Sequence, residues 1–178
     1  MAGTDEIIGE LLDVAARRLA AYGYLLTGSQ HAGEELVQAA IVKVFVRRRR
    51  IPNAQAAEGY VRAAMRSVHI DRMRREKVWR RIAPGQVARE DVPDHANRIA
   101  TADALGNALS TLSPRQRTAV VLRYFDDLTV AGVAAEMQLA DGTVKRYLSE
   151  ALDRLAVVVG SEAFEIEYVA VVDRESRS

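Results

Sequence analysis

The chain contains no cysteine, and it has only four prolines and few aromatic residues among its 178 positions. Without thiols it can form neither disulfides nor thiolate metal sites, and a reducing compartment, the cytoplasm, is the expected location. No run of about 18 apolar residues is present, and the N-terminus MAGTDEIIGE lacks the basic and then apolar pattern of a signal peptide. Because Ala, Leu, Val and Arg are abundant instead, an all-α fold is predicted.

Enzymatic motifs are missing from the sequence as well. We find no glycine-rich phosphate loop, no metal-ligand cluster and no nucleophile with an adjacent base. The histidines His31, His69 and His95 are far apart in the sequence, and they do not form a ligand set by spacing. The expected protein therefore binds partners rather than catalysing a reaction, and it needs no cofactor or metal.

The net charge of +1 conceals a strong asymmetry along the chain. Between Lys43 and Arg81, thirteen basic residues stand against three acidic ones, a local excess of ten positive charges. Residues 1–42 are acidic, with two arginines against six acids. A basic stretch of this density is typical of a surface that binds a polyanion, although a solvated arginine-rich helix face would have the same composition.

Apolar periodicity predicts three N-terminal helices, over about 6–26, 31–48 and 56–75. Gly28 suits the left-handed end of the first helix. Pro52 disfavours helix at the residue before it, which predicts a loop there. Three helices of this length suffice for a small bundle.

The pattern dissolves over residues 82–101, where prolines, a glycine and scattered polar residues predict a flexible linker. A short helix is predicted over 102–112. The sequence Ser113-Pro114-Arg115-Gln116 then begins another, because Ser113 can cap it and Gln116 completes a capping box.

The stretch Leu112 to Leu155 predicts a helix-turn-helix. Apolar residues recur at helical spacing on either side of the interruption at Gln138 to Gly142: Val130, Val133, Ala134 and Met137 before it, and Val144, Leu148, Ala151, Leu152 and Leu155 after it. Two short amphipathic helices so close together must cross to bury these faces. Such a module places one helix in the major groove of DNA.

This order of bundle, linker and helix-turn-helix resembles the extracytoplasmic-function (ECF) sigma factors of the sigma-70 family, in a variant typical of actinobacteria. YGYLLTGSQHAGEELVQ and AEGYVRAAMRSVHIDRMRR resemble region 2, and LSPRQRTAVVLRYFDDLTVAGVAAEMQLADGTVKRYLSEALDRL resembles region 4. The resemblance implies two small helical domains. The expected boundaries are a region 2-like bundle over 1–81, a linker over 82–101, a region 4-like domain over 102–156 and an acidic extension over 157–178.

The resemblance also implies site residues. Core RNA polymerase is expected to bind Glu35, Leu36, Val37 and Gln38. The residues expected to melt and read the minus-ten promoter element are Arg49, Arg50, Asn53, Arg62, Arg66, Ser67, His69, Asp71, Arg72 and Arg75. Reading single-stranded bases requires a basic groove, which the arginines provide, and surfaces that hold flipped bases. For His69 a surface or interfacial position is favoured over a specific role.

The minus-thirty-five element is expected to contact Arg115, Arg117, Thr143, Lys145, Arg146 and Tyr147. Lys145 and Arg146 can meet phosphates or guanine edges, and the helix N-terminus near Gly142 suits a phosphate. Between Leu112 and Leu155, however, six basic residues are balanced by six acidic ones. Because affinity for DNA rests largely on phosphate neutralisation, weak binding or an altered preference is predicted.

The chain departs from the usual family pattern at Ala39, Ser67, Gly132, Tyr147 and Glu150. The expected function is promoter-specific initiation, with core RNA polymerase, promoter DNA and an anti-sigma factor as partners. The departures keep two alternatives open: a stand-alone helix-turn-helix regulator, and a sigma-like decoy that occupies polymerase or an anti-sigma factor without productive initiation. The acidic extension, with its strand-like alternation at 164–168, either folds back over a DNA or polymerase surface or is a partly disordered end.

Overall fold

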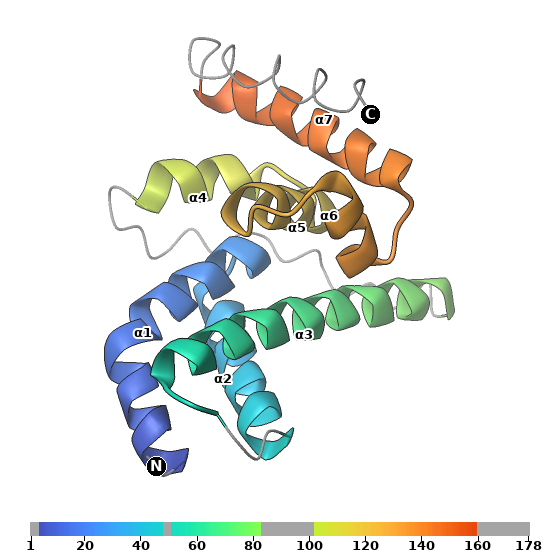
Figure 1. Ribbon diagram of the computed structural model, residues 1–178. Helices are drawn as coiled ribbons and strands as arrows, with labels where there is room; N and C mark the ends of the chain where they lie inside the picture. Colours follow the sequence, from blue (N-terminus) through green and yellow to red (C-terminus); the bar gives the residue numbers. More distant parts are fainter. Residues whose placement is uncertain (1–3, 48–50, 83–101, 160–178) are drawn as a thin grey trace, which may run out of the picture.

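The computed structural model describes residues 4–47, 51–82 and 102–159, and all regular secondary structure within these ranges is helical (Figure 1). The elements are α1 (Thr4–Thr27), α2 (Gln30–Arg47), α3 (Ala54–Ile82), α4 (Ala102–Ser110), α5 (Pro114–Val120), the π-helical turn η1 (Val121–Phe125), α6 (Val130–Met137) and α7 (Asp141–Val159). The predicted all-α fold is confirmed. Most of the predicted linker and extension, 83–101 and 160–178, lies outside the described residues, as does the strand-like segment. None of the described helices is long and apolar enough to cross a bilayer.

Helices α1, α2 and α3 form the N-terminal bundle. Apolar residues three or four positions apart on α1 are fully buried, among them Leu11, Ala15 and Leu19. They pack on the buried stripes of α2 and α3. The backbones of α1 and α2 come very close where Gly23 faces Gly33, since a Cβ built on Gly33 would lie 2.8 Å from the carbonyl carbon of Gly23.

The ends of these helices follow from local chemistry. Gly28 adopts a φ of 75° and donates its N–H to the carbonyl of Tyr24 at 2.7 Å, which ends α1. Asn53 begins α3, because its Oδ1 accepts the N–H of Ala56 at 2.8 Å. Helix α3 continues to Ile82, seven residues beyond Arg75, through a stretch without glycine or proline.

The C-terminal helices begin with the predicted capping box, and both of its hydrogen bonds are present at Ser113 and Gln116. Helix α5 then widens into η1, where the N–H of Asp126 donates to the carbonyl of Val121, five residues back. Gln138 ends α6 in a left-handed conformation with φ 53°. The apolar faces of α6 and α7 are buried against each other, as the helix-turn-helix pattern predicts.

The two groups of helices pack together, with α1 against α5 and α3 against α6 (Figure 1). Each core contains a residue from the other group. Val121 of η1 belongs to the core of the N-terminal bundle, whereas Ile70 of α3 belongs to the core of the C-terminal helices. The described residues therefore form a closed arrangement, in which one side of α3 is covered.

Candidate polymerase and nucleic-acid interfaces

The expected polymerase site on α2 divides between the core and the surface. Glu35 and Gln38 are exposed, whereas Leu36 is fully buried and Val37 packs partly on the core. Leu36 thus anchors α2 in the bundle, whereas Glu35 and Gln38 are the side chains that a partner can contact. Glu35 lies 3.4 Å from His31 one turn earlier.

Two exposed valines extend this outer face of α2. Val42 and Val46 are 62% and 78% exposed, and they follow Gln38 at spacings of four residues. Single exposed apolar side chains also occur elsewhere, as at Leu12 and Val14 of α1, so the exposure of this pair does not by itself identify a binding surface. This pair was not singled out from the sequence. Both valines fall outside the apolar stripe that packs into the core of the bundle, and this spacing could have identified them as exposed.

The residues expected to read the minus-ten element do not share one surface. Arg62, Arg66 and His69 lie on the covered side of α3, facing the C-terminal helices. Arg75 is exposed, and Asp71 and Arg72 are half-buried. Asn53 caps α3, while Ser67 accepts a hydrogen bond from the Lys43 ammonium at 2.9 Å. Arg49 and Arg50 lie outside the described residues.

His69 is an interfacial histidine. Its side chain is buried between α3 and α5, and its Nε2 lies 2.9 Å from the hydroxyl of Thr118. Burial, with a further contribution from the positive charges of Arg117 and Arg72, lowers the pKa of His69 to about 4. Its imidazole is therefore neutral at pH 7.

This burial predicts an acid-sensitive packing of α3 on α5. An exposed histidine takes up a proton near pH 6.5 and the packed one only near pH 4, so the opened or unfolded chain binds more protons between these values. Stability falls as the pH drops through this window and is unaffected above it. At pH 5 we expect a loss of about 2 kcal/mol.

Urea denaturation of the whole chain at several pH values measures this loss. His69→Gln, which does not titrate, is the matched control and removes the contributions of other groups. If the wild-type chain and the variant lose the same free energy of unfolding between pH 7 and pH 5, the histidine is not responsible.

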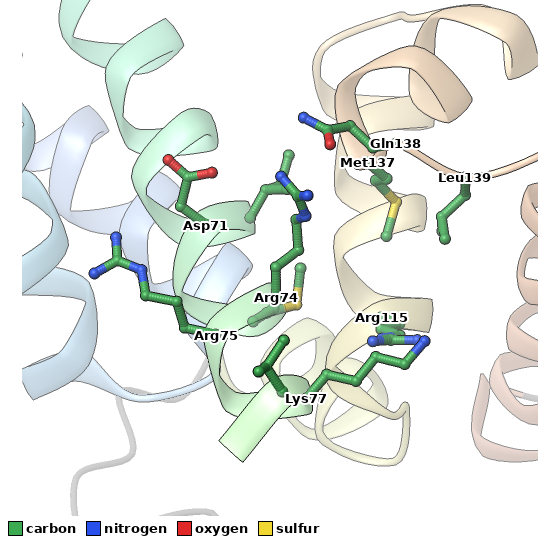
Figure 2. A pocket seen from close by; sticks show the side chains of 11 residues that line it. Asp71, Arg74, Arg75, Lys77, Arg115, Met137, Gln138 and Leu139 are labelled. Atoms are coloured by element: carbon green, nitrogen blue, oxygen red, sulfur yellow. The ribbon is translucent and has the colours of Figure 1, made fainter. Parts of the chain in front are cut away.

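A basic cleft lies between the C-terminal half of α3 and the helices α5 and α6 (Figure 2). Its volume is about 540 Å³, and its apolar lining includes Met73 and Met137. The cationic side chains that line it are Arg74, Arg75, Lys77 and Arg115. In Figure 2, Arg75 points to the side of α3 away from Met137 and Leu139. Arg74 and Lys77 were not among the expected site residues, because their closeness to Arg115 depends on the packing of distant segments.

The outer face of α7 carries most of the residues expected to contact the minus-thirty-five element. Lys145 and Arg146 are exposed, and Thr143 and Tyr147 are half-buried. The guanidinium of Arg146 lies 5.5 Å from the centre of the Tyr147 ring, and Arg115 Nη1 lies 3.5 Å from the Tyr147 hydroxyl. Tyr147 also packs partly on the core of the C-terminal helices, so these side chains form a cationic and aromatic group beside the buried stripe of α7.

Glu150, one of the departures from the family pattern, is held by a local contact. Its Oε2 accepts a hydrogen bond from Gln116 Nε2 at 2.7 Å, and its Oε1 lies 3.9 Å from Arg146. The carboxylate therefore ties α7 to the capping box of α5. It also offsets part of the positive charge next to the expected DNA contacts.

Arg117 lies away from any outer surface. Its side chain is buried, its Nε and Nη2 donate to the carbonyl of Leu109 at 3.0 and 2.9 Å, and its Nη1 donates to the carbonyl of Thr27 at 3.0 Å. Burial lowers its pKa. The expected phosphate contact of Arg117 is not available in this arrangement, because the guanidinium is used to join α4, α5 and the end of α1.

Comparison with known proteins places the chain in a family. A profile described as Sigma-70, region 4 matches residues 102–155. The RNA polymerase sigma-E factor of Streptomyces antibioticus is 30% identical over 131 residues, which are 68% of this chain and 67% of the relative. The sigma-E factor of Streptomyces avermitilis is 28% identical over 142 residues, 80% of this chain and 79% of the relative.

Two further similarities are more distant. The ECF RNA polymerase sigma factor SigL of Mycobacterium tuberculosis is 25% identical over 154 residues, 84% of this chain and 86% of the relative. The sigma factor RpoE of Bartonella quintana, solved with the anti-sigma factor NepR, superposes with a TM-score of 0.54 at 20% identity. That match covers 87% of this chain and 98% of RpoE, and it shows a shared fold.

The helix-turn-helix and the basic side chains along α3 are typical of all-helical proteins that bind DNA. The relatives narrow this class, and the chain belongs to the extracytoplasmic-function sigma factors of the sigma-70 family. The resemblance seen in the sequence is thereby confirmed, and the sigma-E and SigL relatives named above come from actinobacteria.

Proposed function

We propose that this sigma factor binds core RNA polymerase through the outer face of α2 and directs it to promoters through α3 and α7. In this proposal α3 reads the minus-ten element, α7 reads the minus-thirty-five element, and polymerase supplies the catalysis in the cytoplasm. The organisation proposed with it is a region 2-like unit over 1–81, a linker over 82–101, a region 4-like unit over 102–156 and an extension over 157–178.

The observation that carries the proposal is the division of α7 into two faces. Its inner face, with Val144 and Leu148, is buried against the rest of the helix-turn-helix. Its outer face presents Lys145 and Arg146 from the N-terminal half of the helix, which is the half that meets base edges in such modules. The recognition helix is thus held rigidly while its basic side chains remain accessible.

Charge weighs against a tight minus-thirty-five contact. Asp141 lies in the first turn of α7, where it competes with a phosphate for the positive end of the helix, and Glu150 lies next to Arg146. Each phosphate contact steepens the linear fall of the logarithm of the binding constant with the logarithm of the salt concentration by about one unit. With few accessible cations on α7, the region 4-like unit depends on polymerase to hold it at the promoter.

The polymerase contact is supported by the outer face of α2, which combines Glu35 and Gln38 with Val42 and Val46. Most of the apolar surface of a helix in a small bundle is needed for its core, yet these valines are left outside. A protein partner that covers them removes apolar surface from water, which is the main driving force for association. Ala39, one of the departures from the family pattern, is uncharged and half-buried. The interface therefore lacks a charged contact at this position.

The test is co-purification of the chain with core RNA polymerase, followed by run-off transcription from a genomic fragment library. We expect a stable complex and discrete new start sites. Lys145→Glu should keep the complex and lose transcripts that depend on a minus-thirty-five element. Arg17→Glu makes the same charge change at an exposed position of α1 and should leave transcription unchanged.

Other outcomes select the alternatives. A complex that yields no new transcripts would identify a decoy. No complex at all, together with specific binding of duplex DNA by the chain alone, would identify a stand-alone regulator.

A further inference from the structure

Asp126 occupies a special position at the contact between the two groups of helices. Its side chain is only 5% exposed, and its carboxylate contacts side chains of the N-terminal bundle. Its Oδ2 accepts the hydroxyl of Tyr22 at 2.5 Å, and its Oδ1 lies 2.9 Å from Arg62 Nη2. Arg66 Nη1 lies 3.5 Å from Oδ2.

The π-helical turn puts this carboxylate in place. Asp126 is the first residue after η1, and its N–H is tied to the carbonyl of Val121, which is itself buried in the core of the bundle. The next residue, Asp127, adopts a left-handed φ of 51° and is exposed. Two adjacent aspartates are thereby separated, one pointing into the interface and the other into solvent.

Asp126 meets the residues that the proposed function assigns to the minus-ten element. Arg62 also lies over the Tyr22 ring, 4.5 Å from its centre, so the guanidinium is held both by an aromatic face and by a carboxylate. Two turns beyond Arg62 along α3, His69 is buried against Thr118. The same side of α3 that carries these cations is therefore covered by α5 and η1.

We propose that Asp126 takes the place of a DNA phosphate between Arg62 and Arg66, so that the C-terminal helices and minus-ten DNA compete for one face of α3. The chain without polymerase then rests in a closed state with low affinity for single-stranded DNA. The proposal depends on the proposed function for its assignment of this face to DNA. A carboxylate and a phosphate both accept hydrogen bonds from guanidinium groups, which is why one anion can replace the other.

The closed state is incomplete, which allows it to open. Within the described part of the chain, Arg66 Nε is buried with no hydrogen-bond partner, and the Arg66 contact to Asp126 is the longer of the two. A buried donor without an acceptor favours any rearrangement that gives it one. Phosphates of a DNA strand provide such acceptors, and a partner that binds only the separated helices shifts the population toward the open state.

The experiment uses the full chain with Asp126→Asn and with Asp127→Asn as a matched control. Both variants remove one negative charge, they are adjacent, and asparagine tolerates the left-handed conformation of residue 127. Small-angle X-ray scattering reports the separation of the two groups of helices. Fluorescence anisotropy with a short single-stranded DNA of mixed sequence reports access to α3.

We expect Asp126→Asn to increase the radius of gyration and to tighten binding to the oligonucleotide about tenfold. The apparent affinity rises because a larger fraction of the molecules is open and able to bind DNA. Asp127→Asn should resemble the wild-type chain in both measurements. Tyr22→Phe, which removes one hydroxyl and preserves the ring under Arg62, should change both in the same direction by less. It supports the proposal independently if Asp126→Asn folds poorly.

Two results would overturn the inference, and they differ in what they leave standing. If the wild-type chain binds the oligonucleotide and neither Asp126→Asn nor Tyr22→Phe alters scattering or affinity, the competition is absent while the assignment of α3 to DNA survives. If the variants open the chain with no gain in DNA affinity, then α3 does not bind DNA through this face, and the proposed function fails there as well.

Discussion

Gly33→Ala is expected to lower the free energy of unfolding of the N-terminal bundle by about 2 to 3 kcal/mol. The added Cβ would lie 2.8 Å from the carbonyl carbon of Gly23 and from the N of Tyr24. Both atoms are backbone, so no side-chain rotation can relieve the overlap, and α1 and α2 must move apart. Alanine favours a helix over glycine by about 1 kcal/mol, which offsets only part of this loss.

Gly59→Ala is the matched control for this prediction. Gly59 lies within α3, it is exposed, and a Cβ there would have no atom within 4 Å. Only the helix preference acts at this position, so stability should rise by about 0.5 to 1 kcal/mol. Urea denaturation followed by far-UV circular dichroism measures both variants. Equal shifts in the same direction would show that the approach of α1 to α2 does not limit stability.

Arg117→Met should destabilise the chain by about 3 kcal/mol without weakening DNA binding by the molecules that remain folded. Methionine fills much of the same space but donates none of the three hydrogen bonds that Arg117 makes to the carbonyls of Leu109 and Thr27. The side chain is buried, so water cannot fully replace these donors. The loop at Gly28 should loosen as well, because the Arg117 guanidinium packs directly on it.

Arg115→Met provides the contrast to this variant. Arg115 is half-buried and lines the basic cleft, with its Nη1 3.5 Å from the Tyr147 hydroxyl. Its replacement should weaken binding to promoter DNA in the polymerase complex and change stability by less than about 1 kcal/mol. If the two variants exchange these effects, with Arg117→Met lowering DNA affinity at unchanged stability, then Arg117 is a phosphate contact and its hydrogen bonds to Leu109 and Thr27 do not stabilise the folded chain.

Much of the fold could be predicted from the sequence because its signals are local. The capping box at Ser113, the left-handed end at Gly28 and the apolar stripes of α6 and α7 each depend on residues a few positions apart. The division of the chain into a basic bundle and a neutral helix-turn-helix likewise follows from composition. These features predict the helices, whereas the family is indicated by the resemblance of two sequence stretches to regions 2 and 4.

The packing between the two groups could not be predicted in this way. Asp126 and Arg117 are polar residues that would be expected at the surface, and each contacts a segment far away in the sequence. For His69 a surface or interfacial position was expected, but its partner Thr118 was not. For Arg117 a signal was present, since it lies three and four residues before the buried Val120 and Val121, on the inner side of α5. The charge of Arg117 predicts a position at the surface, whereas its spacing from Val120 and Val121 predicts burial, which is what the structure shows.

The π-helical turn determines which changes this segment tolerates. An α-helix advances by about 100° per residue, and η1 contains one residue more per turn than an α-helix would need. If residues 121–126 adopted an α-helical turn without a change in their number, the following residues would be rotated by about that angle, which would turn Asp126 away from Arg62. Substitutions that keep the hydrogen bond from the N–H of Asp126 to the carbonyl of Val121 preserve the contact, whereas those that favour an ordinary α-turn here weaken it. Among related chains, we therefore expect the wider turn to be present wherever an acidic residue occupies this position.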